Sequence, residues 1–111
     1  MLITNGSVVI LRAGVVTPDS IRNGAEWVDT IDKVYNLSVQ ASPKTAKQDP
    51  ATVNLLLAAV PNQHYALTFA SNIIKKGGTI KKDPVHGNPY HALVSDITVE
   101  DLYAIFNINK H

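Results

Sequence analysis

The stretch "TIKKDPVHGNPYHALVSD" (residues 79–96) decides the fold. Its two ends, residues 79–83 and 90–96, have the pattern of strands. The six residues "PVHGNP" between them are long enough for a hairpin loop, and Gly87 can supply any positive φ that the loop needs. The stretch therefore predicts an antiparallel hairpin late in the chain.

Working outward from this hairpin, two more strands and four helices are expected. Residues 7–12 are continuous and β-branched, and residues 35–42 alternate apolar with polar side chains, as strands do. Each predicted helix begins at a residue that can cap it, and the four helices span residues 17–24, 49–60, 68–78 and 98–106. The order β-α-β-α-α-β-β-α predicts an α+β domain, a small mixed sheet with helices packed on it.

Length and composition set further bounds. A chain of 111 residues with 45% apolar and 17% charged residues is expected to form a single domain, residues 1–111, with its own core. The absence of cysteine excludes disulfides and thiolate chemistry, and fits the cytoplasm. The apolar run at residues 8–11 is too short for a signal peptide or a membrane span, so we expect no membrane association.

The net charge of the chain is close to zero, so any binding of a polyanion must depend on a local cluster of basic residues. Ten basic against nine acidic residues give a net charge of +1, which offers polyanions no strong overall field. Four lysines nevertheless fall within eight residues, and with His86 they are the expected substrate-binding residues: Lys75, Lys76, Lys81 and Lys82. A patch that faces phosphate is one interpretation; lysines that complement a helix end and protect an edge strand are the other.

The histidines favour acid–base chemistry over metal binding. His86 and His91 flank a turn without cysteine or a helical His-x-x-x-His pair, so we expect no metal and no cofactor. Metal-free RNA cleavage needs a base, an acid and a cation for the phosphorane charge. The expected catalytic residues are His91, His64, Tyr90 and Arg12. The alternative is that the His91 ring only bonds a neighbouring carbonyl.

The sequence allows more than one role for Arg12 and for Trp27, and it gives no sign of a serine hydrolase. Arg12 ends a strand, where it can bind phosphate in a cleft or pair with a nearby carboxylate on the surface. No serine lies in a Gly-x-Ser-x-Gly setting, so a serine hydrolase triad is not expected. Trp27 can stack on a base or fill a small core.

Four segments taken in order resemble a group of small bacterial proteins, similar to modules at the ends of secreted polymorphic toxins. They are "VVILRAG" (8–14), "YNLSVQASP" (35–43), "VPNQHYALTFASNIIKKGG" (60–78) and "NPYHALVSDITVEDLYAIF" (88–106). The resemblance implies a compact effector that acts on RNA or a nucleotide. It places Arg12, His64, Tyr90 and His91 at the polar points of the pattern, whereas His86 matches none of them. The near-neutral charge departs from the basic balance of ribonuclease toxins.

Two function classes follow. The first is a toxin-like cytoplasmic effector that cleaves or modifies RNA or a nucleotide, in which Arg12 and His91 share a hollow. The second is a non-catalytic module, such as an antitoxin, immunity protein or phage-encoded inhibitor, that binds a cognate protein partner. That module is expected to expose Trp27 and Tyr90 together in an apolar patch.

Overall fold

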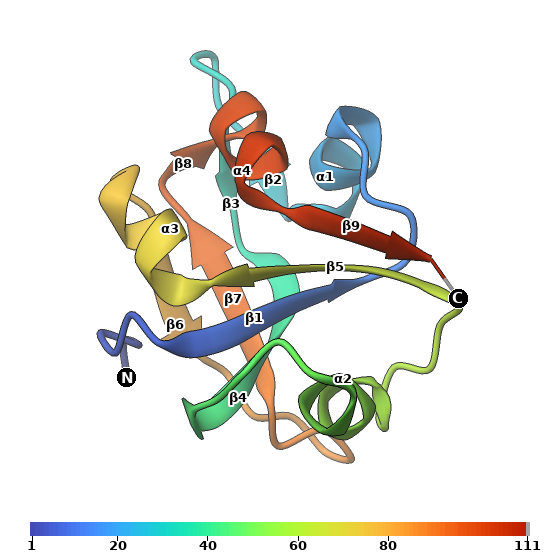
Figure 1. Cartoon of the computed structure of the whole chain (residues 1–111). Helices are drawn as coiled ribbons and strands as arrows, with labels where there is room; N and C mark the ends of the chain where they lie inside the picture. The colour runs from blue at the N-terminus through green and yellow to red at the C-terminus, as the bar shows by residue number, and fades with distance from the viewer. Residues whose placement is uncertain (111) are drawn as a thin grey trace.

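The chain is an α+β protein, as predicted, and the predicted order of elements is confirmed (Figure 1). The computed structural model describes the backbone of residues 1–110 and the side chains of residues 1–106. The elements are β1 (Val8–Ala13), α1 (Pro18–Gly24), β2 (Trp27–Val28), β3 (Lys33–Tyr35), β4 (Leu37–Thr45), α2 (Pro50–Leu57), β5 (His64–Phe69), α3 (Ala70–Lys75), β6 (Thr79–Lys82), β7 (His91–Ser95), β8 (Ile97–Thr98), α4 (Val99–Ile105) and β9 (Asn107–Lys110).

The strands form a large and a small sheet. The large sheet has the order β6-β7-β4-β1-β5-β9 and the small one the order β2-β3-β8. Every pairing between these strands is antiparallel. The predicted hairpin is confirmed, because β6 and β7 pair from Thr79 opposite Ser95 to Lys82 opposite Ala92.

Capping residues start three of the four helices as predicted. Thr17, Asp49 and Thr98 each accept a hydrogen bond from the backbone N–H three residues later, at 3.0 to 3.1 Å. These bonds satisfy donors that the first helical turn leaves without a partner. Within the described residues, no helix is long and apolar enough to cross a membrane.

The third helix differs from the prediction. Residues 64–69 form β5, and α3 begins only at Ala70 without a capping side chain. Thr68, the predicted cap, is buried in the strand and lies opposite Ile10 of β1. Pairing with β1 on one side and β9 on the other holds residues 64–69 extended, and this outweighs the local signal for a helix start.

Two apolar clusters cover the two faces of the large sheet. The larger cluster joins β1, β4 and β7 to α1, α3 and α4, whereas the smaller one joins β1 and β5 to α2. In Figure 1, α2 accordingly lies across β1 from α1, α3 and α4. We call the side of the larger cluster the packed face and the side of α2 the α2 face. Because side chains alternate along a strand, the register of each strand decides which face a residue occupies.

The small sheet continues two strands of the large one around a corner. Asn36 separates β3 from β4 and Asp96 separates β7 from β8, and both residues have positive φ, at 54° and 67°. Asn and Asp adopt this left-handed conformation more readily than other non-glycine residues. The two corners lie side by side, because the backbone N–H of Asn36 donates to the Ser95 hydroxyl at 3.0 Å.

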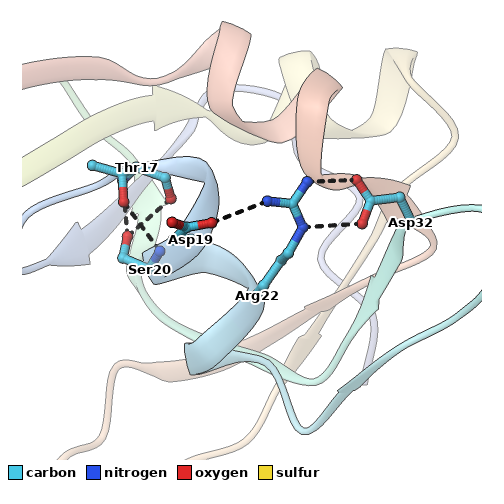
Figure 2. Close-up of polar contacts among 5 residues, drawn as sticks. All are labelled: Thr17, Asp19, Ser20, Arg22 and Asp32. Atoms are coloured by element: carbon cyan, nitrogen blue, oxygen red, sulfur yellow. Dashed lines mark hydrogen bonds and ion pairs between the residues drawn. The ribbon is translucent and has the colours of Figure 1, made fainter.

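Helix α1 is fixed to the tip of the β2–β3 hairpin. The Arg22 guanidinium donates to both carboxylate oxygens of Asp32, at 3.2 and 3.0 Å, and to Asp19 at 3.3 Å (Figure 2). Thr17 and Ser20 form a reciprocal capping box at the start of the helix. These contacts hold the small sheet against the rest of the molecule.

Candidate functional site

His91, at the start of β7, is bound through both ring nitrogens. Its Nδ1 lies 2.9 Å from the Asp83 carbonyl oxygen and 3.2 Å from Asp83 Oδ2, and its Nε2 lies 3.0 Å from Ser38 Oγ. A carbonyl oxygen can only accept a hydrogen bond, so in the neutral ring Nδ1 carries the proton. Nε2 therefore accepts a hydrogen bond from the Ser38 hydroxyl. The His91 ring in turn donates a hydrogen bond from Nδ1 to Asp83.

This direction of donation suits a serine nucleophile. A base within hydrogen-bond reach of a hydroxyl can remove its proton, and a third group that holds the other ring nitrogen fixes the tautomer. The His91 side chain is only 15% exposed, so its ring is held between its two partners. Ser38 is half-buried. We refer to Ser38, His91 and Asp83 as the Ser-His-Asp cluster.

Strand register brings the cluster together. Gln40 of β4 lies opposite His91, which places Ser38 diagonally across from His91 on the same face. On the other side, the backbone N–H of Asp83 donates to the His91 carbonyl at 3.0 Å, because the hairpin continues one residue beyond β6. Pro84 follows at once and has no N–H to extend the ladder.

The loop after Asp83 is anchored near the cluster. The buried Asn88 side chain donates to Gln40 Oε1 at 2.6 Å and accepts from the Tyr90 backbone N–H at 3.2 Å. Tyr90 is half-buried and packs against the smaller apolar cluster, which we call the α2 cluster. Tyr90 therefore helps to seat the chain just before His91.

A row of residues crosses three strands beside the cluster. Lys81 of β6 lies opposite Leu93 of β7, which lies opposite Ser38 of β4. Lys81 is exposed and Leu93 is half-buried, whereas Val94 on the packed face is fully buried. Neighbouring strands lie about 4.8 Å apart, so the long side chain of Lys81 can lean over Leu93 toward Ser38. This part of the α2 face is open and carries a cation.

Arg12 reaches the same serine from the other side of the sheet. Residues two apart in a strand share a face, so Arg12 lies on the packed face with Ile10. Its Nη1 donates to the Ser38 carbonyl oxygen at 2.8 Å. Its Nη2 lies directly beneath Gly24, where a β-carbon would overlap it. Burial lowers the pKa of Arg12. Arg12 and His91 thus both contact Ser38, but they lie on opposite faces and do not share the expected hollow.

The other predicted catalytic residue lies apart from the cluster. His64 begins β5, which is two strands away from β4 in the sheet. It is half-buried, and its backbone N–H donates to the Asn62 side chain at 3.0 Å. His86 is exposed in the loop between β6 and β7. Among the described residues, no hydrogen bond or ion pair joins His64 or His86 to His91.

The four lysines do not form one patch. Lys75 and Lys76 lie at the end of α3, which covers the packed face, and Lys76 lies 4.0 Å from Asp101. Lys81 and Lys82 are neighbours in β6 and point to opposite faces. Of the four, Lys81 shares a face with the Ser-His-Asp cluster, and Lys82 lines a hollow together with Tyr90 and His91.

A surface hollow of about 240 Å³ lies at one end of β7. Neither Ser38 nor Asp83 lines it, so the hollow and the hydroxyl of the cluster are separate features. The hollow is lined by Ala41, Ser42, Pro43, Lys82, Pro89, Tyr90 and His91.

Within residues 1–106, no three His, Cys, Asp or Glu side chains gather closely enough to hold a metal ion. Comparisons with models of protein families, with curated proteins and with solved structures found no match. The resemblance to toxin modules remains a prediction from the sequence.

Sequence reasoning identified His91 but missed Ser38 and Asp83. No serine lies in a Gly-x-Ser-x-Gly setting, but a serine in the middle of a strand needs no such motif to contact a histidine on the next strand. The alternation of residues 35–42 already placed Ser38 and Gln40 on one face. The missing information was the register between β4 and β7, which joins residues 53 positions apart.

Proposed function

We propose that this protein is a small effector enzyme that cleaves a phosphate ester of the RNA or nucleotide class, with Ser38 as nucleophile and His91 as its base. The observation that supports it is the set of contacts around His91: Nε2 lies 3.0 Å from the Ser38 hydroxyl, Nδ1 lies 2.9 Å from the Asp83 carbonyl oxygen, and the Asp83 carboxylate oxygen Oδ2 lies 3.2 Å from the same nitrogen. A serine hydroxyl is a weak nucleophile until an adjacent base removes its proton.

The chemistry proceeds in two balanced steps. Ser38 Oγ attacks phosphorus while its proton passes to His91 Nε2, and the leaving oxygen takes that proton as its bond to phosphorus breaks. A water molecule then attacks the phosphoserine, and His91 moves the water's proton to the departing Ser38 oxygen. Asp83 orients the ring and stabilises the imidazolium during both steps. These steps need no cofactor.

An anionic substrate fits the open part of the α2 face. Lys81 is exposed in the row beside Ser38, where its ammonium can hold a phosphate oxygen. The net charge of +1 gives little long-range steering, so recognition depends on this local cation.

Arg12 has a positioning role in this proposal. Its guanidinium binds the Ser38 carbonyl oxygen from the packed face, so it fixes the serine backbone without touching the substrate. This replaces the phosphate-binding role that the sequence suggested for Arg12.

The proposal is tested with purified protein, a short RNA and bis(p-nitrophenyl) phosphate at neutral pH in the presence of EDTA. Cleavage should occur in the unmodified protein and fall by about 10³-fold or more in Ser38→Ala. Ser95→Ala is the matched control, because Ser95 lies on the same face but its hydroxyl contacts Asn36. Equal activity in Ser38→Ala, or none in the unmodified protein, would overturn the proposal.

The effector part of the proposal has a separate test in cells. Expression in a bacterial host should arrest growth if the enzyme degrades RNA or a nucleotide, whereas Ser38→Ala should be tolerated at the same protein level. Normal growth with the unmodified protein would contradict a toxin-like role.

A further inference from the structure

The most exposed aromatic feature lies in the small sheet, away from the Ser-His-Asp cluster. Trp27 of β2 lies opposite Tyr35 of β3, and their rings stack with centroids 3.7 Å apart and planes 11° from parallel. Trp27 is 51% exposed even though Tyr35 covers one side of its indole ring. The other face of the indole is therefore open to solvent.

The stack stands on a rigid support. The Tyr35 hydroxyl donates to Asp29 Oδ2 at 3.2 Å, and Asp29 Oδ1 accepts from the backbone N–H groups of Ile31 and Lys33, both at 3.0 Å. Arg22 holds the same hairpin through Asp32 (Figure 2). A surface that is already ordered loses little entropy on binding, which favours affinity.

The charge around the stack is negative. Residues 19–36 carry four carboxylates, those of Asp19, Glu26, Asp29 and Asp32, against two cations, Arg22 and Lys33. The rest of the chain has eight basic against five acidic residues, so the negative charge is local. Carboxylates beside an open indole attract a cation and repel a phosphate backbone.

We propose that the open face of Trp27 is a docking site for an arginine-bearing basic segment of a partner protein. A guanidinium stacks on the indole, since tryptophan is the best aromatic partner for a cation and arginine the commoner donor. Asp29, whose Oδ2 accepts from the Tyr35 hydroxyl of the stack, pairs with a flanking cation, and Glu26, which precedes Trp27 and accepts from the Asn36 side-chain amide, adds negative charge nearby. Ile31, 62% exposed at the hairpin tip, adds an apolar contact.

This inference does not depend on the catalytic proposal, because it uses a different sheet and none of the same residues. It also corrects the surface expected for a protein-binding module. Tyr90 is half-buried against the α2 cluster, so the aromatic partner of Trp27 is Tyr35 and not Tyr90.

Trp27 is the only tryptophan, so its fluorescence reports on the site. The full chain is titrated at low salt with a nine-residue peptide of alternating arginine and glycine, with the matched lysine peptide and with an eight-nucleotide uridine RNA. The arginine peptide should change the fluorescence saturably and bind about fivefold more tightly than the lysine peptide. The RNA should leave Trp27 unchanged.

Two variants and a control complete the test. Glu26→Gln keeps the tryptophan and should weaken peptide binding about threefold. Trp27→Ala, followed by calorimetry, should abolish it, whereas Tyr103→Ala, an exposed aromatic on α4, should leave it unchanged. Circular dichroism checks that each variant is folded. Equal binding to Trp27→Ala, equal affinity for both peptides, or a larger response to RNA would overturn the proposal.

Discussion

The two faces of the sheet differ most where β4 and β7 pair. On the packed face, Leu37, Ala92 and Val94 are completely buried under helices. On the α2 face, the alternating neighbours Ser38 and Leu93 are partly exposed, and the His91 side chain is 15% exposed. Adjacent residues of the same two strands therefore differ in their surroundings: those on the packed face form the core, whereas those on the α2 face keep contact with solvent.

Replacing His91 should give the largest effect, because it should lower the cleavage activity strongly and the stability of the fold only slightly. His91→Gln removes the base and should lower the rate of phosphate-ester cleavage by about 10³-fold or more. The two lost hydrogen bonds should cost only about 1–3 kcal/mol of unfolding free energy. Steady-state rates and urea unfolding measure the two effects. A small loss of activity would remove His91 from the mechanism.

The same substitution on each face should give different stabilities. Leu37→Ala leaves a cavity in the packed face and should lower the unfolding free energy by about 3 kcal/mol. Leu93→Ala removes a half-exposed side chain and should cost about 1 kcal/mol or less. Urea unfolding of the two variants compares them directly. Equal losses would show that the α2 face is packed there after all.

A double-mutant cycle tests whether Arg12 holds Ser38 from the packed face. A β-carbon at Gly24 would overlap the Arg12 guanidinium, so Gly24→Ala should displace it and cost about 1 kcal/mol. In the Arg12→Met background the same change should cost less, because only the Leu37 side chain, 3.2 Å from the added carbon, must then give way. Equal effects in both backgrounds would mean that Arg12 does not occupy this position.

The smallest effect is expected at acid pH in the small sheet. Hydrogen bonds from the backbone N–H of Lys33, and then of Ile31, lower the pKa of Asp29. A carboxyl with a lowered folded pKa stabilises the fold above its unfolded value, near 3.9, and this contribution is lost as pH falls through the folded pKa.

Trp27 fluorescence during acid titration should therefore change below about pH 4 and not between pH 5 and 8. Asp29→Asn keeps the shape of the side chain but removes its charge, and should abolish the pH dependence. A transition centred above pH 5 would require a different titrating group.

The sequence predicted correctly the helix starts that depend only on interactions between residues close together in the chain. Thr17, Asp49 and Thr98 cap helices as expected, because a capping bond spans only three residues. The prediction at Thr68 was wrong because pairing with strands far along the chain holds that residue in β5. The small sheet was missed, since strands of two or three residues are too short to show an alternating pattern.

The candidate site was only partly predictable for the same reason. His91 stood out by residue type, but its partners Ser38 and Asp83 depend on two strand registers that the sequence does not reveal. A register also decides the face of each side chain, so Arg12 was predicted beside His91 although it lies across the sheet.

Labelling with a fluorophosphonate, followed by peptide mass spectrometry, tests most directly whether the Ser-His-Asp cluster activates a nucleophile. We expect a phosphonyl adduct on Ser38 in the unmodified protein and none in His91→Gln, with Ser95 unlabelled in both. Labelling that is absent from Ser38, or that persists there without the His91 imidazole, would contradict this expectation.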